Sequence, residues 1–531
     1  MKTPEIQNQV NKPKIYRFFE ILPGLVSLSV LALPFVLSLV STSIASIYVI
    51  AFLLLWFSKA LGMNVRALQG WHVMQAQLKL DWHKMLGDVE NKKCSYGKAP
   101  DWHQHNIDRM NDFGWHVKPS EVIHAVIIAT HNESKEVVEP TIQAVKNLNF
   151  DSSKVLLIIA YEERAGEWKS VETEDLAKKY KSGFMDVIAI KHPKDIPGEM
   201  KGKGGNITYA GRFLKDYLEQ KNIDLKRVLV TTLDADNRPH PLYLAALTYT
   251  FCVTNEPKYV SYQPIPMFTN NIWDAPAPMR VIATGNSFWM IVQSLRPHML
   301  RNFSSHAQPM EALVATDFWS VRTIVEDGHQ FWRSYFALDG KHDVYPIYVP
   351  IYQDAVLAEN YRKTFKEQFI QLRRWAWGVT DVSYVAYFGF FKKNKINKWD
   401  LTAKFLRLFE SHVSWATAPI ILAISAFIPL YINPSSRTSF LANQLPLFAS
   451  KLQTIAMLGI LVTLFLSFKS LPPKPAHYRR HRSIWMVLQW VYLPFTSIFY
   501  SSFAAIYSQT RLVLGKYYGS FDATVKSTKK H

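Results

Sequence analysis

The sequence is poor in cysteine and comparatively poor in acidic residues. Its 531 residues include two cysteines, Cys94 and Cys252. Two cysteines exclude a disulfide framework or a metal site built of cysteines, and they fit a reducing, cytosolic surrounding. Acidic residues number 42 against 61 lysines and arginines, which gives a formal charge of +19. This balance suits nucleic acid, an anionic membrane surface or a phosphorylated substrate as a partner.

The sequence also lacks the features of a nucleic-acid-binding protein. It contains no dense block of lysine and arginine, and aromatic and basic residues do not interleave in a recognised binding motif. The basic residues instead flank uncharged segments, which is the positive-inside pattern of membrane proteins. We therefore expect contact with membrane lipid and no nucleic-acid partner.

Long apolar runs at the N-terminal end predict a membrane hairpin. Residues 21–40 and 44–57 carry no charge, and each run approaches the roughly 20 residues of a bilayer crossing. A signal peptide is the alternative, but two tandem runs without a clear small-residue cleavage site argue against it. The turn would lie at residues 41–43. The near, cytosolic side would hold the flanking cations Lys14, Arg17, Lys59 and Arg66.

The C-terminal part predicts further spans. Residues 415–432 and 455–468 are candidates, and the basic stretch 469–482 that follows indicates the cytosolic side. Residues 484–514 are too long for one simple span, and Pro494 could divide them into a span and a re-entrant or interfacial piece. We expect about five crossings in an integral protein of the cell membrane, with its central domain in the cytosol.

The central part alternates between strand and helix patterns and predicts one α/β unit with a mostly parallel, Rossmann-like sheet. The expected strands are 122–129, 155–161, 186–191, 227–233 and 259–263, and the expected helices include 135–148, 172–180 and 207–218. Ligands of such sheets bind at the carboxyl ends of the strands. The expected organisation is a tail and hairpin (1–63), an interfacial linker (64–120), the α/β domain (121–400), C-terminal membrane helices (401–515) and a basic tail (516–531).

A buried strand ends in two carboxylates. The run 228–233 is apolar and β-branched, and Asp234 and Asp236 follow it with one residue between them. Carboxylates at this position need a compensating partner, and their hard oxygens suit Mg²⁺ or Mn²⁺ shared with substrate phosphates. A solvated turn leading into the next proline is the alternative. We interpret Asp234 and Asp236 as metal ligands.

Polar residues follow the other expected strands and a glycine-rich loop. Asn132 and Glu133 follow the first strand, and Glu162 follows the second, where a nucleotide could lie. Arg164 is interpreted as a solvated loop residue. Lys203 lies in a glycine-rich stretch before a helix and favours phosphate, although the P-loop spacing is absent.

Two further motifs complete the chemistry. Glu326 and Asp327 form an acidic pair in which Asp327 is a candidate general base, with a helix N-cap as the plain alternative and Asp317 as a competitor. Gln371, Arg374 and Trp375 share one face of a helix. An arginine beside an aromatic plane suits a diphosphate and a sugar ring, although a helix lying on the membrane would show similar residues.

Taken in order, these motifs resemble the membrane-embedded family 2 glycosyltransferases, the class that includes cellulose and hyaluronan synthases. The resemblance covers residues 122–378. It is carried by Asn132-Glu133, Asp234-Ala235-Asp236, Glu326-Asp327 and the Q-x-x-R-W element at Gln371. The sequence departs from the family pattern at Glu162-Glu163, where aspartates are usual, and in the spacing around Lys203.

The resemblance implies a GT-A fold, a nucleotide-diphosphate sugar donor such as a UDP-sugar, and Mg²⁺ or Mn²⁺. It implies that Asp234 contacts the nucleotide or the metal, Asp236 binds the metal and Asp327 is the catalytic base. Gln371, Arg374 and Trp375 would hold the diphosphate and the end of the acceptor.

The sequence therefore predicts a membrane-bound inverting glycosyltransferase with a saccharide or lipid-linked acceptor, and we expect a polysaccharide synthase. The alternatives are a transferase that adds one sugar to a lipid carrier, and a non-catalytic membrane scaffold whose α/β domain senses a nucleotide.

Overall fold

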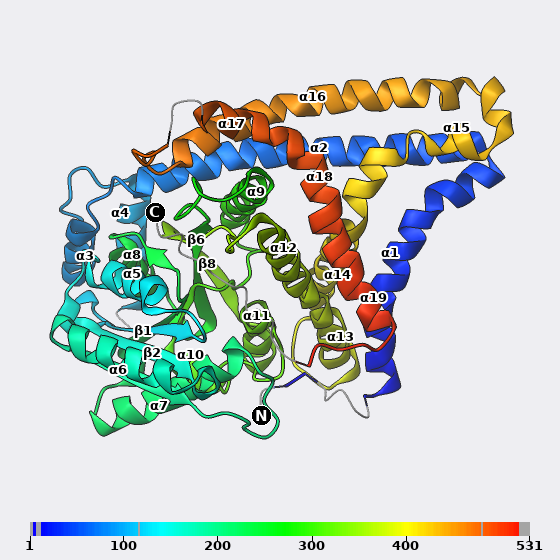
Figure 1. Ribbon diagram of the computed structural model, residues 1–531. Coiled ribbons are helices and arrows are strands. Elements are labelled where there is room, and N and C mark those ends of the chain that lie inside the picture. The colour runs from blue at the N-terminus through cyan, green and yellow to red at the C-terminus, as the bar shows by residue number, and fades with distance from the viewer. Residues whose placement is uncertain (1–3, 7–11, 115–116, 479–481, 520–531) are drawn as a thin grey trace.

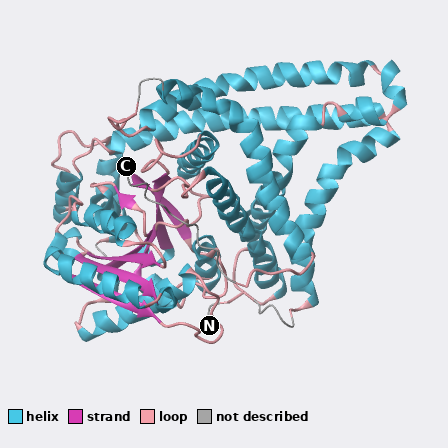
Figure 2. Ribbon diagram, in the orientation of Figure 1, coloured by secondary structure: helices cyan, strands magenta, loops and turns pink. Residues whose placement is uncertain are grey.

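The computed structural model describes residues 4–6, 12–114, 117–478 and 482–519. An α/β unit lies at one side, and long helices extend from it into an arm (Figure 1). Figure 2 shows that the strands are confined to the α/β unit. The segment 520–531, which holds most of the expected basic tail, lies outside the described residues.

One sheet organises the α/β unit. Its strand order is β3-β2-β1-β4-β7-β6-β8-β5. The pairs β1/β2, β2/β3, β1/β4 and β6/β8 are parallel. The pairs β4/β7, β6/β7 and β5/β8 are antiparallel. The expectation of a mostly parallel sheet is confirmed. The strands are β1 (Ile123–Thr130), β2 (Val155–Glu162), β3 (Asp186–His192), β4 (Val228–Asp234), β5 (Arg238–Pro239), β6 (Val260–Met267), β7 (His306–Pro309) and β8 (Asp343–Tyr352).

Helices cover both faces of the sheet, which explains the continuous apolar strands. Successive side chains of a strand point to opposite faces. Val126 and Ile128 of β1 join one core cluster, while Ala125 and Ile127 join another. The helices of this part are α3 (Trp82–Asn91), α4 (Asp101–Phe113), α5 (Lys135–Lys146), α6 (Glu167–Tyr180), α7 (Lys203–Gln220), α8 (Tyr243–Cys252), α9 (Ala277–Ser294), α10 (Met310–Ala315), α11 (Glu326–Ala337), α12 (Tyr361–Ala376) and α13 (Thr380–Ala386).

Five of the eight strands were expected from the sequence, and β8 is the most consequential of the others. This strand contains Pro346 and Pro350, and its partner β6 contains Pro264 and Pro266. Proline removes a ladder donor and masks the strand pattern. The two strands nevertheless pair in parallel, with a register shift between Pro264 and Ile265.

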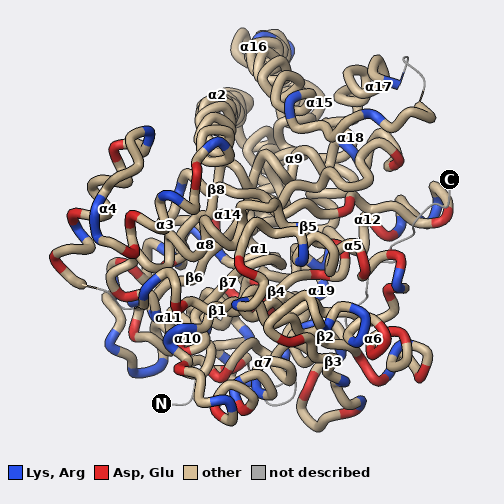
Figure 3. Tube along the Cα trace, turned by 90° about the vertical axis from the view of Figure 1, so that its left-hand side faces the viewer, with Lys and Arg blue, Asp and Glu red and all other residues tan. Residues whose placement is uncertain are grey.

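The membrane-length helices form the arm. Three helices are long and apolar enough to cross a bilayer: α1 (Lys14–Val40), α2 (Thr42–Gln77) and α16 (Phe440–Ser470). In the most apolar 18-residue stretch of each helix, between 11% and 28% of the residues are buried. Most of these side chains therefore face outward. Ser41 separates α1 from α2, which confirms the expected hairpin turn. In Figure 3, α2 and α16 carry few charged residues, whereas charge is dense over the α/β unit.

Among the described residues, three helices meet the length and composition of a span, compared with the expectation of about five crossings. The stretch 415–432 is not one span, because α14 (Lys398–Ile424) ends inside it and the short α15 (Ile428–Ile432) follows. The stretch 484–514 divides into α17 (Arg482–Leu488), α18 (Leu493–Phe495) with Pro494, a π-helical segment (Thr496–Ser502) and α19 (Phe503–Val513).

The expected interfacial linker is largely helical. Helix α2 continues through residue 63 to Gln77, and α3 and α4 follow it. Trp82 is 2% exposed and packs in the core beneath the sheet. The mixed, aperiodic sequence of this segment reflects its packing against the α/β unit.

Candidate active site

The carboxyl ends of the strands open into one large cavity of about 1070 Å³. Parallel strands end at the same edge of a sheet, so side chains that are distant in sequence meet there. Nine of the ten site residues expected from the sequence line this cavity, and Asn132 is exposed outside the lining. The nine are Glu133, Glu162, Lys203, Asp234, Asp236, Asp327, Gln371, Arg374 and Trp375.

Lys203 faces Asp234 across the floor of the cavity. Its Nζ donates to Asp234 Oδ1 at 2.6 Å and to the Ser304 carbonyl oxygen at 2.9 Å. The sequence suggested a glycine-rich loop, but α7 begins at Lys203 itself, so the lysine belongs to the first helical turn. A side chain at Gly204 would place its Cβ 2.3 Å from the Ser320 carbonyl oxygen. The glycine therefore lets α7 approach this segment closely.

Asp236 is held from two sides. Its Oδ2 accepts a hydrogen bond from the Asp354 amide at 3.2 Å, and its carbonyl oxygen accepts one from Asn270 at 3.0 Å. Asp354 follows β8 and also lines the cavity. Asp234, Asp236 and Asp354 all line the cavity, and their oxygens are of the hard type that Mg²⁺ and Mn²⁺ prefer. Asp354 was missed in the sequence because the prolines masked the strand before it.

Glu326 and Asp327 enter the cavity from the first turn of α11. Burial raises the pKa of Asp327, against the lowering effect of the positive charges of Lys203 and Arg374. Burial, reinforced by the charge of Asp327, raises the pKa of Glu326 as well. The N-cap position is Val325, so Asp327 does not cap the helix. A carboxylate with a raised pKa is the better proton acceptor.

Asp317, the competing candidate for the base, lies elsewhere. It is not among the lining residues, and its carboxylate pairs with Arg212 at 3.1 Å in an exposed ion pair. Its positive φ of 54° belongs to a left-handed turn, a conformation that aspartate and asparagine tolerate. The geometry therefore favours Asp327.

Helix α12 brings the Q-x-x-R-W residues into the cavity. Gln371, Arg374 and Trp375 all contribute to the lining, because they share one face of the helix. Gln368 donates to Gln371 Oε1 at 3.0 Å, and the ring of Trp375 lies 6.1 Å from that of Phe268. The face is thus turned toward the strand ends and not toward an external lipid surface.

Glu162, at the end of β2, belongs to a charged cluster. Arg164 lies 2.8 Å from Glu162 Oε2 and lines the cavity, so its interpretation as a solvated residue was wrong. His192 bridges Glu162 at 3.1 Å and Glu199 at 3.0 Å. Burial alone would lower the pKa of His192, but these two carboxylates raise it to about 9.

The raised pKa of His192 predicts a pH-dependent stability. Because the folded-state pKa of about 9 exceeds the ordinary value of 6.5, the stabilisation is complete below pH 6.5 and is lost as pH rises toward 9. We expect the melting temperature of the wild type to fall across this window more steeply than that of His192→Gln. Thermal melts at half-unit pH steps test this, and parallel curves for the two proteins would contradict it.

The cavity also receives residues from α13, α14 and the π-helical segment before α19. Trp415 of α14 donates to Ser501 Oγ at 2.7 Å, and both residues contribute to the lining. Asp381 of α13 lines the cavity as well. Its Oδ1 forms a hydrogen bond of 2.6 Å with Nδ1 of the buried His329 of α11. No motif spacing connects these residues, so sequence patterns do not indicate them.

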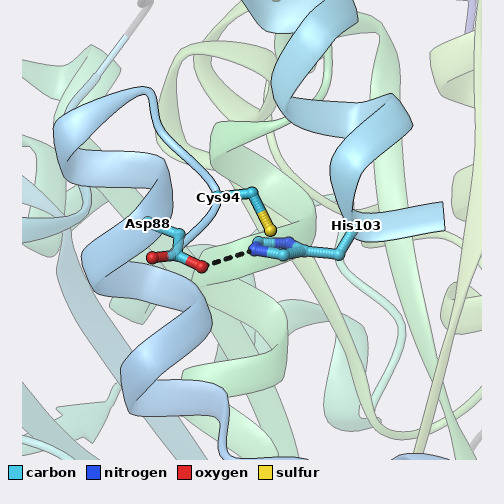
Figure 4. Close-up of side chains that lie close together, drawn as sticks. All are labelled: Asp88, Cys94 and His103. Atoms are coloured by element: carbon cyan, nitrogen blue, oxygen red, sulfur yellow. Dashed lines mark hydrogen bonds and ion pairs between the residues drawn. The ribbon is translucent and has the colours of Figure 1, made fainter. Parts of the chain in front are cut away.

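A second group of possible metal ligands lies outside this cavity. Asp88, Cys94 and His103 place their ligand atoms within 4.8 Å of one another, as Figure 4 shows. His103 is fully buried, and its two ring nitrogens contact Tyr249 at 2.7 Å and Asp88 at 3.1 Å. These bonds satisfy the buried imidazole without an ion.

No family model and no curated protein sequence matches the chain. Similar solved structures include a mannosyltransferase from Pyrobaculum calidifontis in complex with GDP-mannose and Mn²⁺, which is 12% identical with a TM-score of 0.40 and covers 85% of this chain and 99% of that one. Another is S. aureus TarS 1–349 with UDP-GlcNAc, at 11% identity, a TM-score of 0.36, and coverage of 75% and 93%. TM-scores below 0.5 carry no information on the activity of this chain.

Proposed function

We propose that the protein is a membrane-bound glycosyltransferase that moves a sugar from a nucleotide-diphosphate donor to a hydroxyl group of a saccharide or lipid-linked acceptor. The observation that carries this proposal is the shared cavity. It collects the carboxylates Asp234 and Asp236, the buried base candidate Asp327, and the cation and aromatic ring of the α12 face. A scaffold that only senses a nucleotide has no need of a buried acid with a raised pKa.

The residues divide into donor and acceptor roles. Asp234, Asp236 and Asp354 would hold Mg²⁺ or Mn²⁺, which offsets the negative charge of the diphosphate when bound. Lys203 and Arg374 add positive charge beside it. Glu133 and Glu162 lie at the ends of β1 and β2, where the nucleoside would lie.

The transfer itself needs one proton acceptor. Asp327 takes the proton of the acceptor hydroxyl while the oxygen of that hydroxyl bonds to the anomeric carbon of the donor sugar. The bond from that carbon to the diphosphate oxygen breaks, and the nucleoside diphosphate leaves with the electron pair. A displacement in a single step inverts the anomeric configuration, and we propose this outcome. Trp375 offers an aromatic face for the sugar ring.

The membrane orientation is part of the proposal. Lys14 and Arg17 lie at the start of α1, Lys469 lies in the last turn of α16 and Lys59 follows the apolar run within α2. Such cations favour the cytosolic side. The α/β unit would then work in the cytosol, where nucleotide sugars are made available to it.

A donor panel tests the function. The purified full-length protein is incubated with individual nucleotide sugars, including GDP-mannose and UDP-GlcNAc, with Mn²⁺, Mg²⁺ or EDTA. We expect release of nucleoside diphosphate with at least one donor, and its loss in EDTA. Metal-independent turnover, or no turnover with any donor, would contradict the proposal. Labelled product on a gel then distinguishes a polysaccharide, which we expect, from a single addition.

A further inference from the structure

A group of cations lies at the end of the cavity that faces the arm. We call it the basic vestibule and define it as Arg66 of α2, Arg296 and Arg301 in the segment after α9, and Lys404 and Arg407 of α14. Arg301 and Arg407 line the cavity that also holds Asp327. Burial lowers the pKa of Arg301, and the charge of Arg407 lowers it further. The charges of Arg66 and Arg407 also lower the pKa of Arg296, so these arginines lie close enough to repel one another.

The carboxylates nearest to the vestibule are engaged by lysines. Glu410 pairs with Lys59 at 2.7 Å, and Asp400 pairs with Lys404 and accepts from Tyr335 at 2.7 Å. Among the described residues, Arg296, Arg301 and Arg407 form no salt bridge with a carboxylate within 4 Å. Asp343 and Asp400 attract Arg301, and Glu410 attracts Arg296, so part of this charge is compensated. The positive charge that Arg301 and Arg407 bring to the cavity wall favours an anion.

Helix α11 sets the distance between the vestibule and the base. Trp332 lies five residues after Asp327, about 7.5 Å along the helix axis at 1.5 Å per residue. The guanidinium of Arg301 lies 5.0 Å from the centroid of Trp332 and 3.9 Å from that of Phe331. Arg301 thus packs on two buried rings, each 1% exposed, and the anion site lies more than one turn of α11 away from the base.

The surroundings of the vestibule are apolar on the arm side. Met63 of α2 and Leu408 of α14 contribute to the cavity lining, and Met63 and Leu406 are exposed large hydrophobic residues. Helix α2 is one of the candidate membrane spans. The cations thus lie where the headgroup of a lipid would meet the cavity.

We propose that the basic vestibule binds the phosphate of a lipid-phosphate-linked sugar, which is the acceptor of the transfer. This assignment rests on the proposed function. The phosphate pairs with Arg301 and Arg407, the lipid tail follows the apolar side chains of α2 and α14, and the sugar lies in the cavity between the phosphate and Asp327. Cations that serve only to orient a membrane protein need not line its catalytic cavity.

Binding of farnesyl phosphate to the full-length protein tests the proposal. The measurement is made in EDTA and without donor, so that diphosphate chemistry at the carboxylates does not contribute. We expect farnesyl phosphate to bind roughly tenfold more tightly than either farnesol or inorganic phosphate, and Arg407→Glu to weaken its binding by roughly tenfold, a difference of about 1.4 kcal/mol. Arg407 is exposed, so this change leaves the fold intact.

Two variants complete the test. Arg407→Lys keeps the charge and should retain most of the affinity. Arg362→Glu changes an exposed arginine outside the cavity lining and should leave the affinity unchanged. The proposal would be overturned if farnesol or inorganic phosphate bound as tightly as farnesyl phosphate. It would also be overturned if Arg407→Glu and Arg362→Glu lost the same affinity. Failure of the proposed function is a different result: no donor would be turned over, while the binding of farnesyl phosphate would still depend on Arg407.

Discussion

Replacing Asp327 with Asn is expected to reduce glycosyl transfer by about 10²- to 10⁴-fold, the usual contribution of a general base. Asparagine has nearly the same shape but cannot take the proton of the acceptor hydroxyl. The side chain lies in the first turn of α11 and faces the cavity, so the change should not disturb the fold. The turnover number is measured with saturating donor, and donor affinity is measured separately and should stay close to that of the wild type.

The matched control is Asp317→Asn. Asp317 lies outside the cavity lining and forms an exposed ion pair with Arg212, so its loss should leave transfer nearly unchanged. Retention of wild-type turnover by Asp327→Asn, or equal losses in the two variants, would remove Asp327 from the role of base.

Replacing Asp236 with Asn is expected to abolish metal-dependent turnover. The amide keeps an oxygen that can accept the hydrogen bond from the Asp354 amide, but it loses the charge that a divalent cation requires. We expect weaker binding of Mn²⁺, measured by calorimetry, and a loss of activity of at least about 10²-fold, in line with the several kcal/mol that a metal ion supplies. Excess Mn²⁺ should recover part of the activity at most.

Asp224→Asn is the control for this variant. Asp224 precedes the opposite end of β4, where it accepts from the Lys226 amide at 3.0 Å. Its replacement should affect neither Mn²⁺ binding nor turnover. If Asp236→Asn binds Mn²⁺ as tightly as Asp224→Asn does, the assignment of Asp236 as a ligand fails.

The central strands and their polar ends could be predicted from the sequence because the information is local. The apolar run before Asp234 specifies a buried strand, and the parallel pairing of β1, β2 and β4 brings their ends to one edge. The face of α12 follows from the helical spacing of Gln371, Arg374 and Trp375. Short-range periodicity was therefore sufficient for these elements.

The remaining part of the site depends on long-range contacts. Asp354 follows a strand that prolines disguise, and the pairing of β8 with β6 exists only in the folded sheet. The fold buries His103 beside Tyr249, 146 residues away in the chain, and no local pattern indicates this contact. The arginines of the basic vestibule come from three separate segments. Their meeting cannot be derived from spacing, because it is created by the packing of the arm against the α/β unit.

The narrow contact at Gly204 has a consequence for engineering this site. A Cβ there would lie 2.3 Å from the Ser320 carbonyl oxygen and 3.1 Å from Glu326 Cβ, so one missing methyl group sets the gap between the helix that begins with Lys203 and the helix that carries Asp327. Any larger residue would push the two helices apart together with their opposite charges. Selection for altered donors should therefore leave this position untouched and act on the periphery of the pocket.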